Sequence, residues 1–149
     1  MPIGIYLDHV DAKMPTLAYE YDVGYDIYAT EDVTVPVGCV REVPTGICLA
    51  LPAGIFAQIN ARSSYGKRGV LLHHGVLDPG YVGHISIWVM NLAKPVDHQG
   101  LQLVKPFAIK KGDKIGQLLF HEAVRVNLEQ VSELPKTERG DKSHGSSGR

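Results

Sequence analysis

EVPTGICLALPAGIFAQIN, residues 42–60, carries the clearest structural signal in the chain. Two runs rich in β-branched, aliphatic and aromatic residues, 42–51 and 55–60, are separated by the turn sequence Pro-Ala-Gly. Neither run places apolar residues at i, i+3, i+4 and i+7, the spacing of an amphipathic helix. This segment therefore predicts two consecutive β-strands.

The same pattern recurs on both sides of this segment. Further strands are predicted at residues 3–7, 25–28, 33–37, 84–91, 101–107, 114–121 and 124–128. The one predicted helix is short and begins near Ser63 or Ser64, where a hydroxyl could cap the first turn. Many short strands separated by Gly and Pro predict a closed or sandwiched all-β fold.

Length and composition exclude several functional classes. At 149 residues, with 44% hydrophobic and 21% charged residues, the chain has the size and make-up of one globular domain. A net charge of -1 gives no basic field for stable nucleic-acid binding. The longest apolar stretch, residues 46–59, contains Pro52 and is too short to cross a bilayer. With no signal-peptide pattern and two cysteines that form no CxxC, we expect a cytoplasmic protein with free thiols.

The last fourteen residues, KTERGDKSHGSSGR, contain no large apolar side chain. We expect residues 1–135 to form the domain and residues 136–149 a flexible C-terminal arm. Arginine together with glycines and small hydroxyls can wrap an anion, so the arm is a candidate lid over phosphate groups. The alternative is a frayed terminus without function.

Three internal segments carry candidate site residues. In residues 61–69, ARSSYGKRG, Arg62 and two serines follow a strand and can form a phosphate site or only a helix cap. In residues 75–83, GVLDPGYVG, the Asp-Pro-Gly-Tyr sequence predicts a type II turn at a hairpin tip that brings Asp78 near Tyr81, or a plain turn. In residues 111–120, Gln117 lies in an apolar strand beside Gly116 and is either a core amide or a donor at a site that a ligand approaches closely.

These segments, in this order, resemble the motifs of the trimeric dUTP diphosphatases (dUTPases). Residues 22–27 (DVGYDI) resemble the first motif, 61–64 (ARSS) the second, 75–83 the third, 112–118 (GDKIGQL) the fourth, and 139–148 the fifth. The resemblance implies a distorted jelly-roll β-barrel with one short helix and a flexible arm. It also implies a homotrimer in which the arm of one chain closes a site built by others.

The implied reaction is hydrolysis of dUTP to dUMP and pyrophosphate, which limits uracil incorporation into DNA and supplies dUMP for dTMP synthesis. By this resemblance Asp78 activates the water that attacks the α-phosphorus, and Tyr81 packs on the deoxyribose. Mg²⁺ is held by substrate phosphates and water, with Asp26 contacting it through water and no direct protein ligand. The remaining expected dUTP contacts are Arg62, Ser63, Ser64, Gly75, Val76, Leu77, Gln117, Arg139, His144, Gly145 and Ser146.

Two departures keep alternatives open. Ser64 and the Asp-Pro-Gly turn also resemble dCTP deaminases of the same fold, so a deaminase or a bifunctional deaminase-diphosphatase is the second hypothesis. Trp88 stands where the deaminase segment has the glutamate that activates water, and an indole cannot transfer protons. His144 replaces the usual phenylalanine and either stacks on uracil or contacts nothing.

A third hypothesis, from a different functional class, is a non-catalytic jelly-roll binding or regulatory module. The histidines show no HxH or HxxxH spacing, so no metal site formed by the protein itself is expected from sequence.

Overall fold

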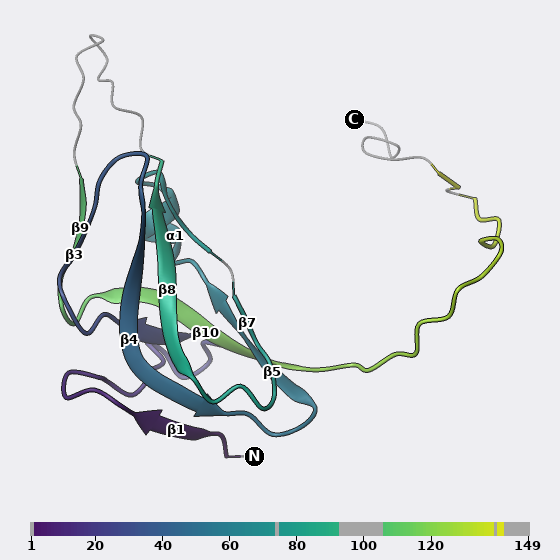
Figure 1. The fold of residues 1–149 in the computed structure, drawn as a ribbon, viewed down its shortest axis with the longest axis horizontal. Coiled ribbons are helices and arrows are strands. Elements are labelled where there is room, and N and C mark those ends of the chain that lie inside the picture. Colours follow the sequence, from purple (N-terminus) through teal and green to yellow (C-terminus); the bar gives the residue numbers. More distant parts are fainter. Residues whose placement is uncertain (1, 74, 93–105, 139, 142–149) are drawn as a thin grey trace, which may run out of the picture.

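The computed structural model describes residues 2–73, 75–92, 106–138 and 140–141, and in them the chain is almost entirely β-structure (Figure 1). Its elements, in chain order, are β1 (Gly4–Leu7), β2 (Tyr25–Tyr28), β3 (Val33–Val35), β4 (Val40–Ala50), β5 (Ile55–Asn60), α1 (Ser63–Gly66), β6 (Val70–Leu72), β7 (Val76–Leu77), β8 (His84–Asn91), β9 (Phe107–Ile109) and β10 (Lys114–Glu122).

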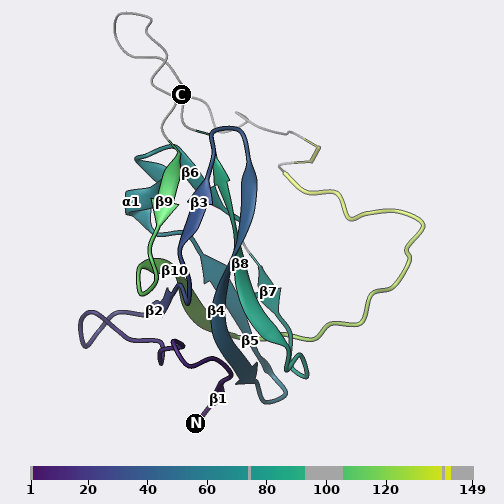
Figure 2. The same ribbon diagram turned by 60° about the vertical axis from the view of Figure 1, so that its left-hand side comes forward.

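Two four-stranded antiparallel sheets face each other. The first has the strand order β1-β4-β8-β6 and the second β2-β10-β5-β7, while β3 and β9 form a separate pair. Turning the molecule by 60° shows β4 and β8 crossing in front of β5 and β7 (Figure 2). This arrangement confirms the predicted all-β jelly roll with one short helix.

Alternation along the strands places the core between the sheets. In β8, residues 85, 87, 89 and 91 are buried while His84 and Trp88 face outward. Gly116 of β10 lies directly against this layer, because a Cβ at that position would come within 2.9 Å of Ile87 Cδ1. The small size of Gly116 therefore serves the packing of one sheet on the other, and the approach of a ligand beside it stays a prediction.

Most of the predicted strands are confirmed, with small shifts at their ends. Residues 25–28, 55–60 and 84–91 form strands with the predicted limits. Of the predicted strand at 101–107, residues 101–105 lie outside the described part, and β9 is found at Phe107–Ile109. The short strands β6 and β7 were not predicted.

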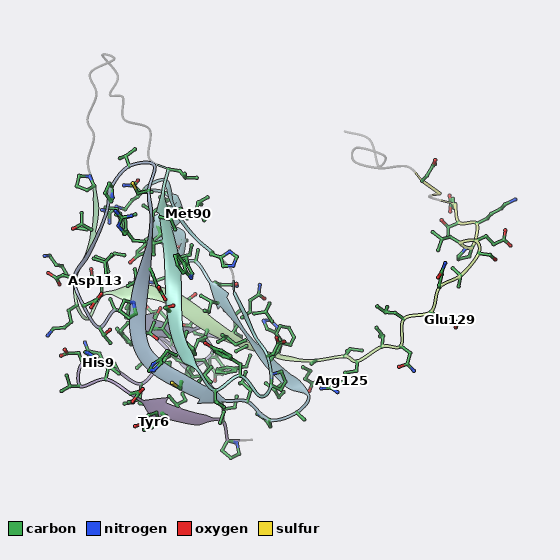
Figure 3. All side chains as sticks on the ribbon, in the orientation of Figure 1. Tyr6, His9, Met90, Asp113, Arg125 and Glu129 are labelled. Atoms are coloured by element: carbon green, nitrogen blue, oxygen red, sulfur yellow. The ribbon has the colours of Figure 1, made fainter. Side chains whose placement is uncertain are left out.

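The strand predicted at residues 124–128 is wrong for this chain. After β10 the described residues form no helix or strand, and the chain leads away from the barrel (Figure 1). Side chains here extend from an isolated segment, as Arg125 and Glu129 show in Figure 3. The alternating apolar residues Val124, Val126 and Leu128 are 86%, 69% and 93% exposed, so the segment has strand-like composition without a neighbouring strand to pair with in the described part of the chain.

Among the described residues, no helix is both long and apolar enough to span a bilayer.

Candidate active site

Asp26 of β2 is a buried carboxylate at the centre of a cluster of hydrogen-bond donors. It is only 2% exposed. Lys114 Nζ lies 2.7 Å from its Oδ2, Gln117 Nε2 donates to its Oδ1 over 3.3 Å, and Arg62 Nε lies 3.6 Å from the same oxygen. A buried charge is tolerated only when it is paired and hydrogen-bonded. Asp26 therefore fixes the positions of three side chains that can bind an anion.

The backbone and neighbouring rings restrain the same donors. Arg62 Nη1 donates to the Lys114 carbonyl over 3.1 Å, and the Tyr65 hydroxyl donates to that carbonyl over 3.1 Å. Burial raises the pKa of Tyr65 to about 12, so this phenol is a donor at neutral pH. The hydrogen bond from Lys114 to Asp26 raises the pKa of Lys114, which keeps the Lys114 ammonium charged.

These donors border a recess of about 410 Å³. Its lining residues are Arg62, Ser64, Tyr65, Arg68, Phe107, Ala108, Gly112, Asp113 and Lys114. Arg62, Arg68 and Lys114 are positively charged at neutral pH, and Asp113 is the one carboxylate in this lining. The recess therefore suits a polyanion such as a phosphate chain.

Helix α1 begins where the sequence predicted, but its cap differs. The N-cap residue is Arg62, with no side-chain hydrogen bond to the first turn. Ser63 and Ser64 are both exposed, so their hydroxyls are directed to solvent and not used in capping. The expectation of a serine cap is therefore wrong, and the hydroxyls stay available to a ligand.

The second group of predicted residues lies on the turn after β7. The Tyr81 N–H donates to the Asp78 carbonyl over 3.1 Å and Gly80 has φ of +92°, as a type II turn requires. The turn does not close a hairpin, however. β7 pairs with β5 of one sheet, while β8 pairs with β4 and β6 of the other, so the turn carries the chain from sheet to sheet.

The Tyr81 side chain is held in a defined position beside Gly83. Its hydroxyl donates to the His84 carbonyl over 2.9 Å, and the ring folds back over Gly83. A Cβ on Gly83 would lie 2.6 Å from the Tyr81 hydroxyl oxygen, so only glycine permits this arrangement. The ring is 48% exposed and presents a flat apolar face.

Asp78 and Tyr81 border a second recess, of about 290 Å³. Its lining residues are Ile59, His73, Gly75, Val76, Leu77, Asp78, Tyr81, His84, Ile85, Ser86 and Trp88. Asp78 is the one carboxylate among them. Trp88 borders the recess at the position where the deaminase hypothesis needs a glutamate, and its indole cannot transfer protons.

The two recesses lie far apart within one chain. Leu77 pairs with Ala57, which places Asp78 beside Phe56, and Arg62 lies six residues further along the chain. At about 3.3 Å per strand residue this separates Asp78 from Arg62 by roughly 20 Å. One triphosphate cannot contact both within a single chain.

The structure thus brings the predicted residues together in two groups. Arg62 and Gln117 contact Asp26, and Ser64 lines the basic recess with Arg62. Gly75, Val76, Leu77 and Tyr81 line the second recess with Asp78. Arg139, His144, Gly145 and Ser146 lie outside the described residues. Lys114 and Arg68 were not among the site residues predicted from the sequence. Both lie in segments that were identified there as carrying candidate site residues, and their positive charge was a signal that could have identified them.

Known proteins of one family are similar to this chain over nearly its whole length. The dUTPase family profile matches residues 10–148. The chain is similar to the deoxyuridine 5'-triphosphate nucleotidohydrolase of Clostridium tetani, with 36% identity over 142 residues that cover 93% of this chain and 91% of the relative.

Two solved structures are also similar. One is a mutant dUTPase of Staphylococcus bacteriophage 80alpha solved with dUpNHpp, with a TM-score of 0.84, 25% identity, and coverage of 99% of each chain. The other is a mutant dUTPase of Staphylococcus aureus phage phi11, described for its coordination of a structural Mg(II) ion, with a TM-score of 0.77, 25% identity, and coverage of 89% of this chain and 98% of that one. The profile match and the relative over 30% identical, each spanning nearly the whole chain, show that this chain belongs to the dUTPase family.

Proposed function

We propose that this protein hydrolyses dUTP to dUMP and pyrophosphate, which keeps uracil out of DNA and supplies dUMP for dTMP synthesis. The observation that carries the proposal is the division of the site into two recesses, one with a single carboxylate beside an aromatic ring and one with three basic side chains. Phosphoryl chemistry needs mainly positioning and charge neutralisation, which these groups supply.

In this proposal Asp78 is the general base. An aspartate is ionised at neutral pH and can take a proton from the water that attacks the α-phosphorus. The nucleoside lies against the same turn, with the Tyr81 ring on the deoxyribose. β7 is an edge strand of its sheet, so the segment Gly75, Val76 and Leu77 can present to the uracil edge the backbone groups that do not pair with β5. The Gly75 carbonyl is not one of these, since it accepts the Ile59 N–H over 2.9 Å.

The triphosphate lies on the Asp26 cluster, where Arg62, Ser63, Ser64 and Gln117 contact its oxygens together with Lys114. Mg²⁺ fits this site as an ion chelated by phosphates and water, because three donors already surround both carboxylate oxygens of Asp26. Asp26 then contacts the ion through water. When bound, the ion neutralises charge on the phosphates.

We further propose a homotrimer with shared sites. The roughly 20 Å between Asp78 and Arg62 in one chain supports sites that combine the turn of one copy with the Asp26 cluster of another. The exposed strand-like residues Val124, Val126 and Leu128 offer a surface for pairing between copies. Residues 136–149, with Arg139, His144, Gly145 and Ser146, serve as the arm that closes the site. The free thiols Cys39 and Cys48 fit a reducing cytoplasm.

A nucleotide panel with product analysis tests the proposed activity. With Mg²⁺ we expect dUTP to give dUMP and pyrophosphate, and dCTP to give no dUTP. Formation of dUTP from dCTP would instead identify a deaminase, and binding without turnover of any nucleotide would identify a binding module.

Sugar selection gives a prediction about Tyr81. If its ring fills the space of a 2′-hydroxyl, wild-type protein turns over UTP very poorly. We expect Tyr81→Ala to reduce the ratio of kcat/KM for dUTP over UTP by on the order of tenfold. The neighbouring Val82→Ala, at a side chain 67% exposed, is the control and should leave the ratio unchanged. Equal turnover of both nucleotides by the wild type would exclude the sugar-packing role.

Mixing two inactive variants tests the shared site. Asp78→Asn removes the base and Arg62→Ala removes a phosphate donor, so each trimer alone is expected to be nearly inactive. Refolded together in equal amounts, the chains should form mixed trimers in which about a quarter of the sites are intact, if assembly is random. Activity should appear on mixing. A mixture of Asp78→Asn with Asp78→Ala is the control, and sites contained within one chain would give no gain in either mixture.

A further inference from the structure

Three side chains that no sequence motif connects meet on the outer face of the first sheet. Asp8 follows β1, Cys48 lies in β4 and His84 begins β8. Cys48 is the register partner of both Tyr6 in β1 and His84 in β8. Register partners point to the same face of a sheet, so the thiol and the imidazole lie side by side.

The contacts among these groups are close. His84 Nε2 lies 3.1 Å from Asp8 Oδ2, and Cys48 Sγ lies 3.9 Å from His84 Nδ1. One potential ligand atom from each of the three residues falls within 4.8 Å of the others. Tetrahedral zinc with one sulfur, one nitrogen and one oxygen ligand has ligand atoms about 3.5 Å apart. In the structure Asp8 lies beside Nε2 and Cys48 beside Nδ1 of His84, so side-chain rotations must bring all three residues onto one ion through a single imidazole nitrogen.

The backbone fixes the positions of the three residues. The Asp8 N–H donates to the Gly46 carbonyl over 2.8 Å, which ties the end of β1 to β4. Gly46 has φ of +65° at an irregularity in β4 between Pro44 and Ile47, and a Cβ there would lie 2.6 Å from the His9 Cβ. Glycine at position 46 thus allows the chain after β1 to approach β4 at this point.

The chemistry of the donor set selects the class of ion. A thiolate is a soft ligand and an imidazole a borderline one, which favours Zn²⁺ and disfavours Mg²⁺. The His84 side chain is 67% exposed and that of Asp8 is 40% exposed, which leaves room for water at a fourth position.

We propose that Asp8, Cys48 and His84 form a zinc site with three protein ligands and one water. This ion is separate from the Mg²⁺ of the proposed reaction, and its site does not depend on that function. It would join β1, β4 and β8, three adjacent strands that the hydrogen bonds of the sheet already align (Figure 1). The carbonyl of His84 accepts a hydrogen bond from the Tyr81 hydroxyl, so the zinc site also lies next to the turn at residues 78–81.

The test uses the full chain without a histidine tag, and without nucleotide or Mg²⁺. We expect one equivalent of Zn²⁺ per chain by equilibrium dialysis, and a thiolate-to-metal charge-transfer absorption with Co²⁺ as the probe. Saturating Zn²⁺ should raise the Tm by about 5 °C. A tenfold excess of Mg²⁺ over Zn²⁺ should displace none of the bound Zn²⁺, because Mg²⁺ binds thiolate poorly.

Matched variants identify the ligands. Cys48→Ser should abolish the cobalt absorption, and Asp8→Asn and His84→Gln should each weaken Zn²⁺ binding by at least about tenfold. Cys39→Ser and His73→Gln, the controls at the other free thiol and another exposed imidazole, should bind as the wild type does. Absence of the cobalt absorption in the wild type would overturn the proposal. The proposal would also be overturned if Cys39→Ser lost the cobalt absorption as Cys48→Ser does. The same holds if Asp8→Asn and His84→Gln both bound Zn²⁺ as tightly as the wild type.

Discussion

Asp78→Asn should lower kcat for dUTP by a factor on the order of 10² or more, because the amide keeps the shape of the side chain but cannot accept the proton of the attacking water. The turn itself should survive. Its hydrogen bond runs from the Tyr81 N–H to the Asp78 backbone carbonyl, and Gly80 supplies the positive φ, so neither depends on the carboxylate. Asp78 is also exposed, so the substitution leaves no unsatisfied buried group.

Binding must be measured separately from turnover. A non-hydrolysable dUTP analogue should bind the Asp78→Asn variant within a few fold of the wild type, because the phosphate donors around Asp26 are unchanged. Asp32→Asn is the control for loss of a surface carboxylate, since Asp32 is paired with Lys110 outside both recesses. Near-normal turnover by the Asp78→Asn variant would remove Asp78 from the mechanism.

The sequence predicted the fold well wherever short-range patterns determine structure. The limits of β5 and β8 were predicted correctly, because each strand has a local sequence pattern of its own. In β8 every second side chain is buried, and in β5 Ala57 and Ile59 are buried between half-buried neighbours. The short strands β6 and β7 contain too few residues to show a period. Residues 124–128 were predicted as a strand and form none. Alternating apolar residues indicate that a segment could be a strand, but a strand forms only where a neighbouring strand is present to hydrogen-bond with it.

The candidate site was predictable in its parts but not in its assembly. Type II turn chemistry at Asp78-Pro-Gly-Tyr is local and was predicted, whereas the turn's passage from one sheet to the other depends on the whole topology. Asp26 was expected only as a water-mediated contact of the ion. Its role as a buried anchor for Arg62, Lys114 and Gln117 depends on pairing between β2 and β10, residues far apart in sequence. Asp8, Cys48 and His84 are separated in the same way, and no spacing motif could detect them.

Deleting residues 136–149 should leave a folded assembly with very little activity. The deleted residues contribute no large apolar side chain, and the described residues from 124 to 138 are all exposed, so the core between the two sheets loses nothing. We expect the Tm and the mass from light scattering, corrected for the missing residues, to match the wild type. A core contribution from this segment would appear as a lower Tm.

The loss of activity follows from what the remaining recesses lack. The phosphate recess is open to solvent on the surface of the barrel, and water competes there with each donor for the substrate oxygens. An arm with Arg139 and several glycines can cover the phosphates and hold the scissile bond in line with the water at Asp78. Without that closure kcat/KM for dUTP should fall by at least about 10²-fold, since small misplacements of reacting groups have effects of that size. Arg149→Ala, which removes one charge at the end of the arm and keeps the rest, is the control and should retain most of the activity. If the truncated protein turns over dUTP as the wild type does, or if it dissociates to monomers, residues 136–149 are not a lid.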